Sequence, residues 1–174
     1  SNPLLAPPKE LLTTGVAAIT TGDNRWLRCD IKSISLLPNV LLRQMAIDAG
    51  AVETVLLRDG FMTEGAASNI FVVRNETLLA PPKNNLMRPG ITYDVVLELA
   101  AAHKIAYQVR AVSEYEVRTA QELLLTSSTK EIMPITHLDG KPVGDGRPGS
   151  MFALLYQLYQ NYKITIMRGG ASTS

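Results

Sequence analysis

The first residue whose type and setting could do chemistry is Lys32, in the segment Asp30-Ile31-Lys32-Ser33. Residues 25–32 alternate between apolar and charged side chains, which predicts a strand with one charged face. A charged face is unusual on a strand unless it lines a polar cavity. Lys32 could be half of an ion pair with Asp30 or Glu64. It could also be an amine whose pKa is lowered by burial, acting as nucleophile and base.

Glu64 is the carboxylate in a run of small residues, Thr63-Glu64-Gly65-Ala66-Ala67-Ser68-Asn69, with no cation next to it in the sequence. The run is typical of a loop ahead of a strand, in which Ser68 and Asn69 make local turn bonds. Small residues also let a planar ligand approach the backbone. A buried carboxylate needs a partner, and a protonated ring nitrogen would serve.

Two further segments could bind an anion. Pro89-Gly90-Ile91-Thr92 opens a predicted helix, whose free N–H groups and dipole favour negative charge. Thr126-Ser127-Ser128-Thr129 is a cluster of hydroxyls, and Glu131 follows Ser128 by three residues, as in a capping box. Either segment alone is explained as a helix cap. An amine, a lone carboxylate and two phosphate-type cradles are together the parts that a pyridoxal 5'-phosphate site requires.

Three sequence runs also resemble a known family. They are RWLRCDIKSISLLPNVL (25–41), GFMTEGAASNIFVV (60–73) and PGIT (89–92). They are similar to the fold-type IV aminotransferases, and most similar to the D-amino acid branch. Branched-chain aminotransferases and aminodeoxychorismate lyases share the second run but usually lack the first. The resemblance covers roughly residues 15–146.

The resemblance implies that Lys32 is the Schiff-base lysine, which moves a proton between substrate and cofactor, and that Glu64 holds the pyridinium nitrogen. It places Arg25 near the cofactor. The groups that it implies for phosphate binding are Ile91, Thr92, Ser127 and Ser128. The implied activity is transamination between a D-amino acid and a 2-oxo acid by a homodimer. Tyr93 departs from the family, which usually has Arg there.

Other functions stay open. Aminodeoxychorismate lyase and branched-chain aminotransferase are alternatives within the same fold. A fragment that folds, binds no cofactor and serves as a dimerisation scaffold is a third. Family members carry a smaller domain ahead of the segments seen here. We therefore expect residues 1–174 to be the larger C-terminal cofactor-binding domain, with the small N-terminal domain absent and little activity from this part alone.

Periodicity predicts the elements that must position these residues. The predicted strands are 15–21, 25–32, 53–57, 69–73, 77–79, 105–109, 122–126 and 132–138. The predicted helices are 38–49, 91–103, 152–162 and a short one capped by Ser113 and Glu116. An extended lead-in and a frayed tail at 168–174 should flank them. Interleaved strands and helices joined by short turns predict the α/β class. The resemblance implies a mixed sheet partly closed as a barrel, with flanking helices.

Composition narrows the function classes. Lys plus Arg is 17 and Asp plus Glu is 16, a net charge of +1, so no basic excess indicates nucleic-acid binding. With Cys29 as the single cysteine and only two histidines, we expect no disulfide within the chain and no metal site.

No apolar run approaches the roughly 20 residues that span a bilayer. No signal-peptide pattern opens the sequence. We expect a cytoplasmic protein with no membrane partner.

Overall fold

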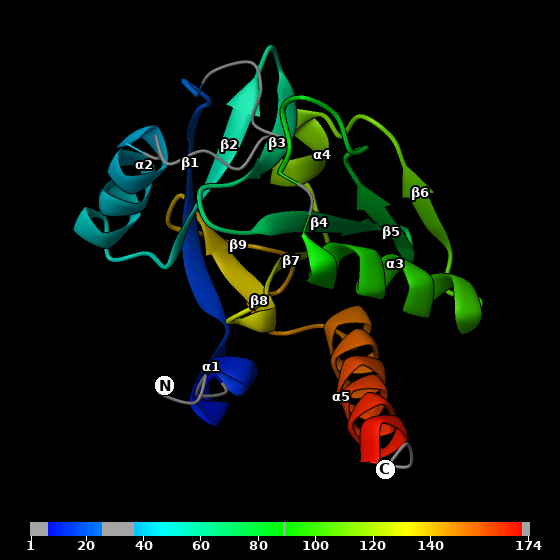
Figure 1. Ribbon diagram of the computed structural model, residues 1–174. Coiled ribbons are helices and arrows are strands. Elements are labelled where there is room, and N and C mark those ends of the chain that lie inside the picture. The colour runs from blue at the N-terminus through cyan, green and yellow to red at the C-terminus, as the bar shows by residue number, and fades with distance from the viewer. Residues whose placement is uncertain (1–6, 26–36, 89, 172–174) are drawn as a thin grey trace.

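A computed structural model of the protein describes residues 7–25, 37–88 and 90–171. Its elements alternate between helices and strands along the chain (Figure 1). In chain order they are α1 (Lys9–Thr14), β1 (Val16–Gly22), α2 (Leu37–Asp48), β2 (Glu53–Arg58), β3 (Phe61–Gly65), β4 (Asn69–Arg74), β5 (Thr77–Ala80), α3 (Ile91–Ala102), β6 (Tyr107–Val109), α4 (Glu114–Arg118), β7 (Glu122–Ser127), β8 (Glu131–Leu138), β9 (Lys141–Pro142) and α5 (Ser150–Ala171).

The described strands form one mixed sheet in the order β3-β2-β1-β8-β7-β4-β5-β6, with β9 paired to β8. β1 runs parallel to both β2 and β8, whereas β7 runs antiparallel to β4 and β8. The sheet curls (Figure 1), and backbone bonds link β3 to the segment that follows β6. The Met62 N–H donates to the Val112 carbonyl at 2.8 Å, and the Glu114 N–H donates to the Gly60 carbonyl at 2.9 Å. The expected mixed sheet, partly closed as a barrel, is confirmed.

Three hairpins turn on two residues that both have positive φ: Asp59-Gly60, Asn75-Glu76 and Asp139-Gly140. Positive φ at both positions is the mark of a type I′ turn, whose twist matches that of paired strands. The first of these turns joins β2 to β3, a strand that the sequence patterns did not predict. Thr63, Glu64 and Gly65 therefore lie in a strand, and the expected loop shrinks to residues 66–68.

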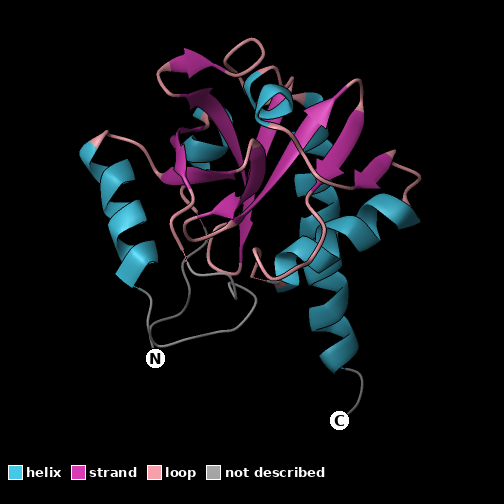
Figure 2. Ribbon diagram, turned by 90° about the horizontal axis from the view of Figure 1, so that it is seen from above, coloured by secondary structure: helices cyan, strands magenta, loops and turns pink. Residues whose placement is uncertain are grey.

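Alternating side chains give the sheet two apolar faces. Ile70, Val72, Leu123 and Leu125 lie in the core on the inner face of the curl. Phe71, Val73 and Leu124 point the other way and pack with residues of α3 and α5. α2 lies apart from α3 and α5 in both views (Figures 1 and 2) and covers β2 through Leu42 and Leu56. Arg25, Asn69 and Arg88, which contact Glu64, are thus attached to well-packed strands and helices.

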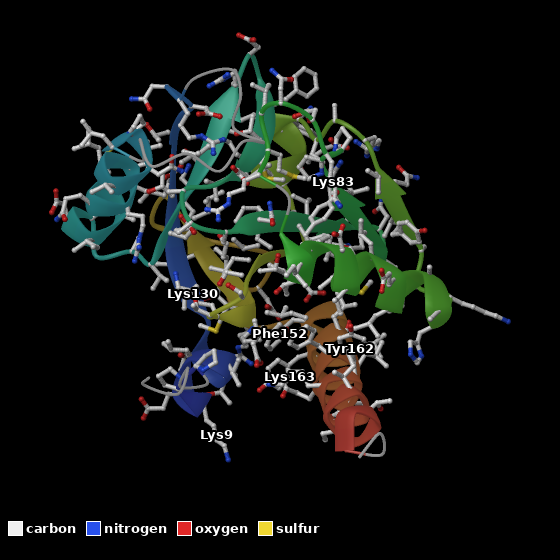
Figure 3. All side chains as sticks on the ribbon, viewed as in Figure 1. Lys9, Lys83, Lys130, Phe152, Tyr162 and Lys163 are labelled. Carbon is white, nitrogen blue, oxygen red and sulfur yellow. The ribbon has the colours of Figure 1, made fainter. Side chains whose placement is uncertain are left out.

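Both ends of the described chain are more helical than expected. Residues 9–14, for which no element was predicted, form α1. α5 continues to Ala171, so residues 168–171, expected to fray, are helical. Phe152, Tyr162 and Lys163 lie along α5 (Figure 3), and Lys163 forms an ion pair with Glu131. This pair ties the middle of α5 to the start of β8. No described helix is both long and apolar enough to cross a membrane.

Gly15, between α1 and β1, should tolerate no side chain. Its φ is 73°, and a Cβ there would lie 2.2 Å from Thr136 Cγ2. Strain and overlap together should make Gly15→Ala lower the free energy of unfolding by about 2–4 kcal/mol. Gly140→Ala is the matched control, because Gly140 has a φ of 78° and open space around it. It should cost only about 1–2 kcal/mol. Equal losses in urea denaturation would show that Thr136 does not restrict Gly15.

Candidate active site

The carboxylate of Glu64, on β3, is 4% exposed and collects donors from three separate segments. Asn69 Nδ2 donates to Oε2 at 3.1 Å, and the Arg88 N–H lies 3.2 Å from both oxygens. Arg25 Nη1 forms an ion pair with Oε1. The sequence has no cation adjacent to Glu64, and the fold supplies one, because Arg25, 39 positions earlier in the chain, follows β1, which lies two strands from β3.

Arg25 is itself held on its other side by Asp23. Nε and Nη2 of Arg25 donate to the two carboxylate oxygens of Asp23, each at 2.9 Å, which is a bidentate pair. Arg58 Nη2 reaches the same carboxylate at 3.2 Å. The buried charges thus alternate in the order Arg58, Asp23, Arg25, Glu64. Two cations and two anions balance within this group, which explains how the interior accepts four ionisable side chains.

Burial raises the pKa of the Glu64 carboxyl from 4.5 to about 7, because the interior disfavours its charged form. The Arg25 guanidinium and the Arg88 N–H act in the opposite direction, since both stabilise the carboxylate. The pKa of Glu64 therefore lies close to neutral pH, so a change in the groups that contact the carboxylate changes its charge. Perturbed carboxyl groups of this kind are concentrated at functional sites.

Three groups meet next to Glu64: the first turn of α3, the side chain of Asn69 and the side chain of Thr126. A Cβ on Gly90 would lie 2.5 Å from Asn69 Oδ1, so the helix start packs directly against Asn69. Asn69 pairs with Thr126 across β4 and β7. The Thr126 hydroxyl is buried and has no hydrogen-bond partner among the described residues. Gly90 offers no side chain to cap the first turn of α3, and Thr92 in that turn is buried.

The two serines predicted for phosphate binding, Ser127 and Ser128, fit that role less well than Thr126 does. Ser127 Oγ accepts the Lys130 N–H at 2.9 Å and is engaged in a local turn, while Ser128 is exposed. The alternative of a capping box is wrong, because Glu131 begins β8 and its carboxylate binds Gln160 and Lys163 on α5. The sequence patterns gave no separate role to Thr126. Its unpartnered hydroxyl, invisible without the structure, is the clearer candidate.

Among the other predicted residues, Ile91 has a side chain that is 81% exposed, so only its backbone could face a ligand at the helix start. Lys32, together with the rest of the predicted strand from residue 26 onward, lies outside the described residues. The structure therefore brings together Arg25, Glu64 and the start of α3, and the place of Lys32 relative to them stays a prediction.

Comparison with known proteins shows which family the chain belongs to. The family model for class IV amino-transferases matches residues 1–138. The chain belongs to the class IV aminotransferases. It is 42% identical over 159 residues to the D-alanine aminotransferase of Bacillus licheniformis, covering 91% of this chain and 56% of that protein. It is 39% identical over 155 residues to the Staphylococcus epidermidis enzyme of that name, covering 89% and 55%.

Solved structures agree with this membership of class IV. The branched-chain amino acid aminotransferase of Escherichia coli superposes with a TM-score of 0.78 at 28% identity, covering 88% of this chain and 53% of that one. A branched-chain enzyme from the organism abbreviated T.th., solved with pyridoxamine 5'-phosphate, gives 0.79 at 26% identity, covering 88% and 52%. The chain spans about half the length of the relatives that it matches.

The residues of this class IV chain fit a pyridoxal-type cofactor. A carboxylate offers about four acceptor positions, and Glu64 receives three donors from the described residues: Arg25, Asn69 and Arg88. The Arg88 N–H is shared between both oxygens at 3.2 Å, and a protonated ring nitrogen could take the place of one half of that shared bond. The buried Thr126 hydroxyl lacks a partner that a phosphate oxygen could supply. The donor set therefore matches both ends of such a molecule.

Tyr93, where class IV members usually have Arg, packs the start of α3. Its ring stacks on Phe71 with centroids 5.2 Å apart, and its hydroxyl donates to the Pro81 carbonyl at 2.6 Å. Both ends of the 81–90 segment are thereby attached to the sheet. Tyr93 is 1% exposed, so it fixes the loop that carries Arg88 and Gly90 and contributes no surface charge.

Glu64 should give the stability of the protein a recognisable pH dependence. Between pH 4.5 and about 7 the unfolded chain releases this proton while the folded chain keeps it. Raising the pH through this window therefore favours unfolding and should lower the free energy of unfolding by roughly 3 kcal/mol. Glu64→Gln should lack this slope. Urea denaturation of both proteins at half-unit pH steps measures it, and parallel curves would contradict the raised pKa.

Proposed function

We propose that this chain forms the cofactor-binding part of a pyridoxal phosphate-dependent aminotransferase acting on a D-amino acid and a 2-oxo acid. The observation that carries the proposal is the buried carboxylate of Glu64, which is held by Arg25, Asn69 and the Arg88 N–H. Membership of class IV and the D-alanine aminotransferase relatives support it. The span of about half of those relatives supports a single domain of a two-domain enzyme.

Each described residue has a specific task in this proposal. The bound cofactor would supply an electron-withdrawing ring that makes the substrate Cα–H acidic. Glu64 would keep the ring nitrogen protonated and thereby sustain that withdrawal. The first turn of α3, with Thr92, would orient the phosphate through backbone N–H groups, and Thr126 would add a hydroxyl. Lys32 would hold the cofactor through its ε-amine and carry the proton to and from Cα.

D-amino acid specificity is favoured over the branched-chain alternative by sequence similarity. Identity reaches 42% with a D-alanine aminotransferase, compared with 28% for the branched-chain enzyme of Escherichia coli. We further propose that the protein is a homodimer. The side chains of α2 that are large, apolar and exposed provide a surface for a partner: Leu37, Val40, Leu41, Met45 and Ile47.

Borohydride reduction of the protein with pyridoxal 5'-phosphate should place a pyridoxyl group on Lys32, as read by peptide mass mapping. The main competing amine is Lys130, whose pKa is lowered by burial. It lies well apart from Lys83 in the fold (Figure 3). Lys130→Ala should leave the adduct unchanged, whereas Lys32→Ala should abolish it. An adduct on Lys130, Lys83 or Lys104 would refute the assignment, and a colourless protein without adduct would favour the scaffold alternative.

Thr126→Val should separate ligand binding from stability. The substitution removes a buried hydroxyl that has no partner among the described residues, so the free energy of unfolding without cofactor should stay equal or rise. Loss of one hydrogen bond to a charged phosphate, worth about 1.5–3 kcal/mol, should weaken cofactor binding about tenfold or more.

Thr136→Val is the control for this test. The Thr136 hydroxyl donates to the Thr14 carbonyl at 3.2 Å, so its loss should lower stability and leave cofactor affinity unchanged. Fluorescence titration with pyridoxal 5'-phosphate and urea denaturation provide the two readouts. Equal affinity for Thr126→Val and the unmodified protein would remove Thr126 from the phosphate site.

A further inference from the structure

Glu53, the first residue of β2, is a second buried carboxylate, and the proposed chemistry does not use it. It is 1% exposed. Its Oε1 accepts the N–H groups of Thr54 at 2.7 Å and Ala66 at 2.9 Å. Its Oε2 accepts the Ser68 hydroxyl at 2.6 Å and the Ala67 N–H at 3.3 Å. The donors that the described residues supply are all uncharged, and three of the four belong to one turn.

That turn, residues 65–68, connects the two residues at the centre of the site. Glu64 precedes it, Asn69 follows it, and the bond from Asn69 Nδ2 to Glu64 Oε2 closes it at 3.1 Å. The Gly65 N–H donates to the Ser68 carbonyl at 2.8 Å. A Cβ on Gly65 would lie 2.9 Å from Glu53 Cδ, so the carboxyl group packs directly on the turn backbone.

A second contact holds the turn from outside. Asn39 Nδ2, on α2, donates to the Ala66 carbonyl at 2.9 Å. The Glu53 carboxylate therefore accepts hydrogen bonds from inside the turn, and Asn39 of α2 donates to a carbonyl group of the turn from outside. A buried donor that loses its acceptor is costly. Without the carboxylate the buried Ser68 hydroxyl and the Ala67 N–H would lose their acceptor and the turn would be held less firmly, whereas the Ala66 N–H would keep the Thr54 carbonyl at 2.9 Å.

We infer that Glu53 is a positioning residue: by binding the 65–68 turn it fixes Glu64 and Asn69 at the spacing that the ring nitrogen and the helix start require. The inference rests on the proposed function for its cofactor readout. Its structural part is independent, because the Arg88 N–H donates to Glu64 and reports whether that carboxylate stays in place.

Glu53→Gln tests the inference, since it keeps the shape but presents an amide NH₂ to donors that need an acceptor. Hydrogen exchange of the cofactor-free protein should become at least tenfold faster at the amides of Ala67 and Arg88. The dissociation constant for pyridoxal 5'-phosphate should rise at least fivefold. Unchanged exchange at Arg88 would overturn the inference whatever happens to stability.

Glu122→Gln is the matched control. Glu122 likewise accepts two backbone N–H groups, from Met151 at 3.0 Å and Phe152 at 2.9 Å, at the start of α5. It should speed exchange at those two amides, lower stability, and leave Arg88 exchange and cofactor affinity within twofold. If Glu122→Gln weakens the cofactor as much as Glu53→Gln does, the role of Glu53 is general stability and the inference is wrong.

Ser68→Ala keeps the inference testable if Glu53→Gln does not fold. It removes one donor from the turn and should speed exchange at the same two amides by a smaller factor. If exchange at both is unchanged, the inference fails. If the unmodified protein binds no pyridoxal 5'-phosphate, the proposed function fails. Exchange at Arg88 still decides whether Glu53 positions Glu64.

Discussion

The removal of the Glu64 carboxylate from water is the constraint on which the rest of the site depends. A buried carboxylate is tolerated only when donors surround it, and no single element of this fold supplies enough of them. A guanidinium after β1, an amide at the start of β4 and a backbone N–H before α3 each contribute. Three distant stretches of chain must therefore converge before Glu64 can be buried. In the resulting network the pKa of the Glu64 carboxyl is about 7, so its charged and neutral forms are similarly populated at neutral pH.

The curled sheet makes that convergence possible. Antiparallel pairing of β4 with β7 places Asn69 beside Thr126, and the same Asn69 touches both the helix start at Gly90 and the carboxylate of Glu64. One residue thus connects the ring end and the phosphate end of the proposed cofactor site. Glu53 acts one step further out, by holding the turn from which Asn69 emerges.

Local sequence patterns predicted those elements whose stability is local. The apolar stripes of α2 and α3 gave their ranges to within one or two residues. β3 was missed because Thr63 and Glu64 break the expected apolar alternation, although Asp59-Gly60 carried a hairpin signal. Local patterns could not predict the pairing of Arg25 with Glu64, since it depends on the order of β1, β2 and β3 in the sheet. The orphan hydroxyl of Thr126 likewise exists only as a relation between neighbours, and the role of Lys32 stays a prediction from family resemblance.

The central position of β1 has a consequence for biosynthesis. β1 is made before β8, which is one of its two neighbours, and Val16 pairs with Ile135. The ribosome must add about 120 further residues before that pair can form, which at about 5–20 residues per second takes roughly 6–24 s. During this interval β1 presents an unpaired apolar edge, the kind of surface that invites association with other chains. The nascent chain is therefore most exposed to aggregation just before β8 emerges, and chaperone binding at β1 would be most useful there.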